Sequence, residues 1–97
     1  MNWQQENEEV LVEETIDTGS GAVSEIVVYN DDVNTFDWVI QCLKEILQHT
    51  EEQAEQLSLL IHFKGKATVK TGPKRDLHPK KDALVDRGLS AVLEDRA

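Results

Sequence analysis

Two predicted helices separated by only two residues constrain the fold of this chain more than any other feature. Apolar residues recur at intervals of three and four from position 36 to 47, and again from 54 to 61. This spacing is typical of helices with one apolar face. Only His49 and Thr50 separate the two predicted helices. A connection this short predicts a tight helical hairpin.

Polar residues that suit helix starts precede both patterns. Asn34 is a candidate N-cap for the first helix, with Asp37 three residues later as its reciprocal acid. Thr50 and Gln53 have the same spacing and predict a capping box for the second helix. We expect the second helix to end before Gly65. Its apolar positions are Ala54, Leu57, Leu60 and Ile61.

Three short segments around the hairpin have strand character. Residues 24–29 are mostly apolar or β-branched, residues 66–71 alternate in polarity, and residues 89–94 close the chain with a third such run. A further helical segment opens at Gly72-Pro73. The order β-α-α-β-α-β predicts an α+β two-layer domain, in which the helices cover one face of a three-stranded antiparallel sheet.

The third helix is less sharply defined at its start than at its end. Pro79 either delays its beginning or kinks it, because proline has no backbone N–H. Gly88 suits a left-handed residue at its C-terminal end. We expect Leu77, Leu84 and Val85 to face the core.

Charge divides the chain into two parts. The formal net charge is −9, and residues 1–25 hold seven acids and no Lys or Arg. Like charges repel, so we expect residues 1–24 to be a flexible acidic N-terminal extension and residues 25–97 to be the folded domain. The apolar Val10–Val12 inside the extension is either a short docking segment or part of a solvated tail.

Composition excludes several classes of function. Cys42 is the only cysteine, which rules out an internal disulfide framework and fits a cytoplasmic protein. It lies beside an apolar helix face, so we expect a buried core thiol. No apolar run reaches the roughly 20 residues that span a bilayer, and the negative charge argues against nucleic-acid or membrane binding. Glycine-rich phosphate loops and common catalytic motifs are absent, so no enzyme activity and no metal or other cofactor is expected.

Two polar features remain as candidates for binding chemistry. Asn30, Asp31 and Asp32 follow the first strand, and His62 lies near the end of the second helix. The simplest interpretation is a turn and a helix-end histidine. Alternatively, amide, carboxylate and neutral imidazole are all hydrogen-bond acceptors, and together they would hold a primary ammonium group.

At these positions the sequence resembles the Clp protease adaptor family ClpS, without a gap from Ile26 to Lys66. The motifs are V-Y-N-D-D at 28–32, E-E-Q-A-E-Q-L at 51–57 and I-H-F-K-G-K-A at 61–67. The resemblance implies an adaptor that binds proteins with a bulky hydrophobic first residue. It would deliver these N-degron substrates to the N-terminal domain of a Clp-family AAA+ unfoldase and its peptidase.

Site roles carried over from the family form three groups. Asn30, Asp31 and His62 fall on positions that bind the substrate's α-amino group, and Asp32 belongs to the same motif. The hydrophobic pocket would comprise Asn34, Phe36, Val39, Ser58 and Ile61. Lys80 would contact the unfoldase, and the N-terminal extension would match the family's flexible tail.

Phe36 and Ser58 depart from the family pattern, because each replaces a methionine of the pocket. One change adds bulk and the other removes it, so we expect a hydrophobic preference with an altered ranking. A second interpretation comes from the end of the chain, residues 72–94, which also resembles the ribosomal L7/L12 C-terminal domain. The chain would then be an interaction module that uses the basic residues between Lys64 and Lys81, without N-degron recognition.

Overall fold

A computed structural model describes residues 23–96 of the chain. The predicted N-terminal extension lies outside the described residues, except for its last two. In chain order the elements are β1 (Val23–Tyr29), α1 (Phe36–Leu47), α2 (Glu51–Lys64), β2 (Lys66–Pro73), α3 (Lys74–Asp86) and β3 (Ser90–Asp95).

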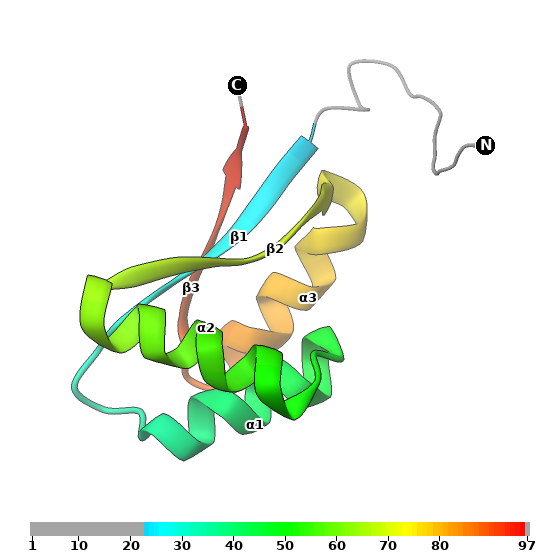
Figure 1. Cartoon of the computed structure of the whole chain (residues 1–97). Helices are drawn as coiled ribbons and strands as arrows, with labels where there is room; N and C mark the ends of the chain where they lie inside the picture. The colour runs from blue at the N-terminus through cyan, green and yellow to red at the C-terminus, as the bar shows by residue number, and fades with distance from the viewer. Residues whose placement is uncertain (1–22, 97) are drawn as a thin grey trace.

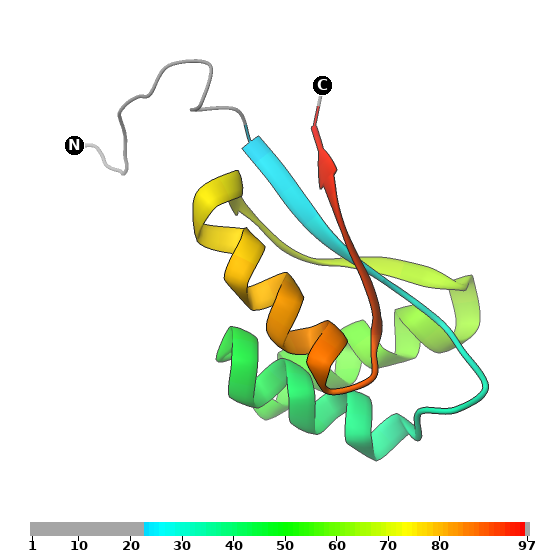
Figure 2. The ribbon, with the colours of Figure 1, turned by 180° about the vertical axis from the view of Figure 1, so that it is seen from behind.

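The three strands form one antiparallel sheet in the order β2-β1-β3. The central strand β1 pairs with both neighbours along its length, so its end at Tyr29 lies opposite Lys66 on one side and Ser90 on the other. The three helices pack against one face of this sheet (Figures 1 and 2). The predicted α+β two-layer architecture is therefore confirmed.

The core lies between the sheet and the helices. Its completely shielded apolar side chains come from both layers, and they include Ile26, Val28, Cys42, Leu43, Leu77 and Leu84. Cys42 is a core thiol as predicted, and burial raises the pKa of that thiol. Val85 was expected beside Leu84 but is 46% exposed, because consecutive helical residues point about 100° apart.

The helix ends follow local capping rules, with one correction. Thr50 and Gln53 form the predicted capping box at the start of α2. The N-cap of α1 is Thr35, whose hydroxyl accepts a hydrogen bond from the backbone N–H of Trp38 at 3.1 Å. The prediction of Asn34 as N-cap is wrong by one residue, because its amide is bound elsewhere.

The buried face of α2 also differs from the expected one. Ala54, Ser58 and Ile61 are buried, whereas Leu60 is 45% exposed and Leu57 is half-buried. A polar residue therefore occupies a position on the inner face of this helix, and an apolar residue beside it faces solvent.

The third helix is continuous through Pro79, so its start is not delayed. Its end is a hydrogen-bonded Schellman motif, as predicted for a left-handed glycine. Gly88 has φ +93° and donates to the Val85 carbonyl, and Leu89 donates to the Leu84 carbonyl. This turn sends the chain back along the sheet as β3.

Strand pairing brings the two candidate polar segments together. Strand β2 begins two residues after α2 ends, and it pairs with β1 so that Tyr29 faces Lys66. The backbone N–H of Asn30 then donates to the Gly65 carbonyl at 2.9 Å. As a result, the loop after β1 lies beside the C-terminal end of α2 (Figure 1).

Candidate functional site

A cavity of about 420 Å³ opens between the loop after β1, the start of α1 and the last two turns of α2. Its lining comprises Asn30, Asp31, Asp32, Asn34, Phe36, Val39, Ser58, Leu59, Ile61, His62 and Phe63. Nine of the ten site residues predicted from the sequence are in this set, and Lys80 is not. Segments that are 30 residues apart in the sequence thus share one cavity.

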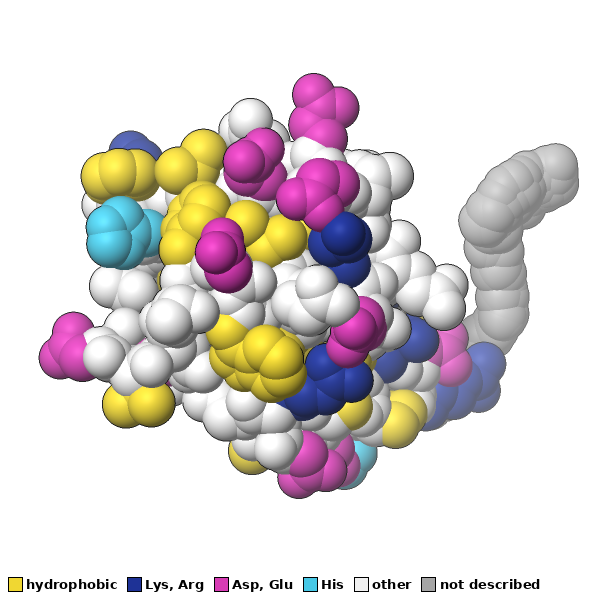
Figure 3. Space-filling view, turned by 90° about the horizontal axis from the view of Figure 1, so that it is seen from below, with side chains coloured by type: hydrophobic (Ala, Val, Ile, Leu, Met, Phe, Trp, Pro, Cys, Tyr) yellow, Lys and Arg dark blue, Asp and Glu magenta, His cyan; other side chains and the backbone are white. Residues whose placement is uncertain are grey.

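The lining divides into a buried wall and an exposed rim. Val39, Ser58 and Ile61 are the buried members. Phe36 is 38% exposed, and the polar residues Asn30, Asp32 and His62 are also exposed. Seen from below, hydrophobic side chains gather on this part of the surface beside a histidine (Figure 3). The cavity therefore combines an apolar interior with a polar entrance.

The three histidines differ in their hydrogen bonding. His49 Nε2 lies 2.7 Å from the carbonyl oxygen of Val69, so this nitrogen donates and ties the helical hairpin to β2. His78 Nδ1 lies 3.3 Å from Asp82 Oδ2 on α3. Within residues 23–96 the ring of His62 has no hydrogen-bond partner, so its nitrogens are free for a ligand at the rim.

Asp31 organises the loop that forms one side of the cavity. Its Oδ1 accepts hydrogen bonds from the backbone N–H groups of Val33 at 2.9 Å and Asn34 at 2.8 Å. Its Oδ2 accepts from the side-chain amide of Asn34 at 2.8 Å and from the Ser90 hydroxyl at 3.2 Å. These bonds, led by the Asn34 backbone, lower the pKa of the Asp31 carboxyl. The group is therefore ionised, and four donors already occupy its oxygens.

The same loop is fastened to the turn between α3 and β3. Asn34 Nδ2 also donates to the Gly88 carbonyl at 2.8 Å, and Trp38 Nε1 donates to the Arg87 carbonyl at 3.0 Å. The guanidinium of Arg87 lies over the Trp38 ring. The loop is therefore fixed from both sides before any ligand arrives.

Two acceptor side chains of the Asn-Asp-Asp segment remain available. Within the described part of the chain, neither Asn30 nor Asp32 uses its side chain in a hydrogen bond or ion pair. Together with His62 they provide an amide oxygen, a carboxylate and an imidazole nitrogen around one opening. This set suits a ligand with several N–H donors and a positive charge.

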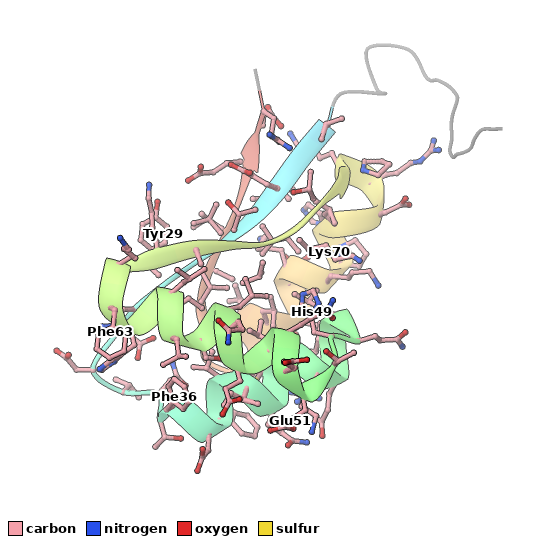
Figure 4. The ribbon with its side chains drawn as sticks, viewed as in Figure 1. Tyr29, Phe36, His49, Glu51, Phe63 and Lys70 are labelled. Carbon is pink, nitrogen blue, oxygen red and sulfur yellow. The ribbon has the colours of Figure 1, made fainter. Side chains whose placement is uncertain are left out.

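Sequence reasoning did not assign two residues of the rim, Leu59 and Phe63. Both project from α2, one turn apart, and Phe63 is 75% exposed. The rings of His62 and Phe63 meet edge to face, with their centroids 4.9 Å apart. Phe63 lies at the same end of the molecule as Phe36 (Figure 4). The available signal was the spacing of Leu59, which lies three residues before His62 and four before Phe63 and so shares a helix face with them.

None of the basic residues between Lys64 and Lys81 lines this cavity. Lys70, Arg75 and Lys80 border a separate groove of about 560 Å³ between β2 and the start of α3. Lys74 lies 3.7 Å from Asp95, and Lys81 lies 2.8 Å from Asp82. Neighbouring carboxylates therefore partly neutralise this surface.

The described part of the chain, residues 23–96, has no group of three or more His, Cys, Asp or Glu side chains placed to hold a metal ion. None of its helices combines the length and the apolar character needed to cross a membrane.

Comparisons with known proteins extend these observations. The chain is 36% identical to the ClpS adaptor of Thermosynechococcus vestitus over 66 residues, which are 67% of this chain and 70% of that protein. It is 36% identical to the ClpS adaptor of Synechocystis over 73 residues, 74% of each chain. A solved structure of Agrobacterium tumefaciens ClpS2 bound to L-phenylalaninamide has the same fold, with a TM-score of 0.72 and 20% identity. The structural match covers 78% of this chain and 99% of the Agrobacterium chain.

The family model of the ATP-dependent Clp protease adaptor protein ClpS matches residues 22–92. This match spans every element of the fold from β1 into β3 and includes all residues that line the cavity. Adaptors of this family serve the Clp protease and are not themselves enzymes. The chain belongs to the ClpS family of ATP-dependent Clp protease adaptor proteins.

Proposed function

We propose that this adaptor binds proteins that begin with a bulky hydrophobic residue and delivers them to the AAA+ unfoldase of a Clp protease. The observation that carries the proposal is the composition of the cavity between the β1–α1 loop and α2. Free acceptors lie at its rim, and an apolar wall lies inside. An N-terminal residue offers the complementary pair, an ammonium group and a side chain on the same carbon.

The rim would hold the α-amino group. A primary ammonium has three N–H donors, and the free side chains of Asn30, Asp32 and His62 each offer an acceptor. Asp31 would act through its negative charge and through the loop that it fixes, because its oxygens already have partners. An internal peptide segment has no ammonium group, so burying these acceptors against it would leave them unpaired and would disfavour binding.

The interior would take the first side chain. Val39 and Ile61 line its buried wall, and Phe36 lies at the entrance. Burying a Leu or Phe side chain contributes roughly 1.5–3 kcal/mol. Each charge-assisted hydrogen bond at the rim contributes about 1.5–3 kcal/mol. After the cost of association, this sum is compatible with an affinity of about micromolar or better.

The ligand of the Agrobacterium tumefaciens structure has the chemistry that this cavity would require. L-Phenylalaninamide carries a free α-amino group next to an aromatic side chain. Because the two proteins share a fold at 20% identity, the ligand supports the substrate class and leaves the preferred residue of this chain open.

Peptide binding tests the proposal directly. We expect a fluorescein-labelled peptide with a free Phe or Leu at its first position to bind in a fluorescence anisotropy titration. The same peptide should lose binding when its α-amino group is acetylated, because the amide nitrogen is neutral and has one donor. Equal binding of the free and acetylated peptides would refute the proposal, as would equal binding of Leu-first and Ser-first peptides.

Delivery needs a second surface, and we place the unfoldase contact at Lys80. This residue borders the groove between β2 and α3, away from the peptide cavity, so an adaptor could hold both partners at once. In a reconstituted Clp degradation assay, Lys80→Glu should slow degradation of a Phe-first substrate and leave peptide affinity unchanged. Lys74→Glu is the matched control because Lys74 does not border the groove. Equal effects of the two variants would exclude a specific role for Lys80.

A further inference from the structure

We propose that Ser58 makes the cavity select tyrosine over phenylalanine as the first residue of a bound protein. The inference rests on the proposed function, since it concerns the part of the same cavity that receives the first side chain. It adds a polar determinant to a pocket that is otherwise described by its apolar wall.

Ser58 is an exception among the polar side chains of the described chain. It lies in the middle of α2 and is 2% exposed, and its hydroxyl oxygen has no hydrogen-bond partner. Buried hydroxyl groups nearly always have a partner, because leaving one unpaired costs most of its desolvation energy. A serine within a helix can bond the carbonyl four residues earlier, yet this hydroxyl makes no such bond.

The position of Ser58 relates the unpaired hydroxyl to the cavity. Ser58 is a lining residue, and the other buried members of the lining are Val39 and Ile61. The amine acceptors Asn30, Asp32 and His62 are at the exposed rim. A first side chain that points inward from the rim would therefore direct its far end toward the buried wall that contains Ser58.

A tyrosine side chain carries a hydroxyl at that far end, and a phenylalanine does not. The phenol can donate to the serine oxygen or accept from the serine O–H. Rotation about the Cα–Cβ bond of Ser58 moves its hydroxyl between staggered positions and brings it to the occupant. Bonding the two hydroxyl groups to each other satisfies both, whereas phenylalanine leaves the Ser58 hydroxyl unpaired.

The role of Ser58 predicts which of the Tyr-first and Phe-first peptides binds more tightly, and side-chain size alone does not predict this order. In a wholly apolar pocket, burying the phenol would be penalised and Phe would bind more tightly. With Ser58 present, we expect the Tyr-first peptide to bind about tenfold more tightly, the ratio expected for one net hydrogen bond.

The experiment measures four affinities by fluorescence anisotropy on the full chain. Tyr-first and Phe-first peptides, identical after the first residue, are titrated with the wild type and with Ser58→Ala. The variant should lose or reverse the preference for Tyr, because alanine offers no hydroxyl group to the phenol. Ser58→Cys, which keeps the size but bonds weakly, should behave like Ser58→Ala. Thermal unfolding of both variants checks the fold.

The outcomes separate this inference from the proposed function. If both peptides bind the wild type equally and acetylation still abolishes binding, the role of Ser58 is refuted and amine recognition stands. If Ser58→Ala retains the full preference for Tyr, the role of Ser58 is likewise refuted. If neither peptide binds the wild type, the proposed function fails, and this inference fails with it.

Discussion

The side-chain amide of Asn34 donates to Asp31 Oδ2 at 2.8 Å and, with its second hydrogen, to the Gly88 carbonyl at 2.8 Å. One side chain thus joins the β1–α1 loop to the turn before β3, 54 residues away in the sequence. Because Asp31 lines the cavity, this relationship fixes the rim through residues that need not touch a ligand.

The two neighbouring acids of the motif should therefore respond differently to mutation. Asp31→Ala removes the acceptor of four hydrogen bonds, so it should lower both peptide affinity and the free energy of unfolding, the latter by about 1–2 kcal/mol. Asp32→Ala removes an exposed carboxylate that has no partner among residues 23–96, and it should lower affinity alone. Urea unfolding and peptide anisotropy of both variants measure these effects. A fully stable Asp31→Ala protein would contradict the scaffold role.

Acid should weaken the fold through Asp31. Hydrogen bonds lower the pKa of this carboxyl in the folded state below its ordinary value of 3.8. A group with a depressed folded-state pKa stabilises the fold at pH values above its unfolded-state pKa. That contribution is lost as the pH falls through the folded-state pKa. The difference in unfolding free energy between wild type and Asp31→Ala should therefore be constant from about pH 7 to 5 and shrink below about pH 4. A difference that stays constant down to pH 2 would argue against stabilisation of the fold by the ionised Asp31 carboxylate.

The ring of His62 should contribute to peptide affinity. A neutral imidazole nitrogen can accept a hydrogen bond from the substrate ammonium. His62→Gln should therefore bind the peptide more weakly than the wild type at pH 8. His78→Gln is the control, because His78 lies on α3 outside the cavity. Equal peptide affinities of the wild type and His62→Gln would exclude His62 as a ligand.

Phe63 should contribute to binding without contributing to stability. It is 75% exposed, lines the rim and contacts the His62 ring. Phe63→Ala should weaken peptide binding by about three- to tenfold, since it removes the aromatic pair that orients the His62 ring, and such a pair is worth about 1 kcal/mol. Leu60→Ala is the matched control, because Leu60 is an exposed apolar residue of the same helix that does not line the cavity. Similar affinities for both variants would remove Phe63 from the site.

The helix ends of this fold are encoded by residues that lie close together in the sequence. The Thr50–Gln53 capping box and the left-handed Gly88 were predictable because each depends on hydrogen bonds between residues three to five positions apart. The order of helices and strands followed from hydrophobic periodicity, and with it the two-layer fold. The resemblance to the adaptor family named nine of the residues that line one cavity.

Other features depended on residues far away in the sequence. Asn34 is a residue type that is common at N-caps. Its side-chain amide donates to the Gly88 carbonyl, however, and Thr35 caps α1 instead. Leu60 is the more apolar residue, yet Ser58 is buried, because the placement of α2 against the core decides which of its faces is inside. The sequence by itself therefore determined the helices and strands and the chemical character of the candidate binding side chains. Only tertiary structure decided which acceptors stay free and which hydroxyl is buried without a partner, because burial and hydrogen-bond competition are set by contacts between distant segments.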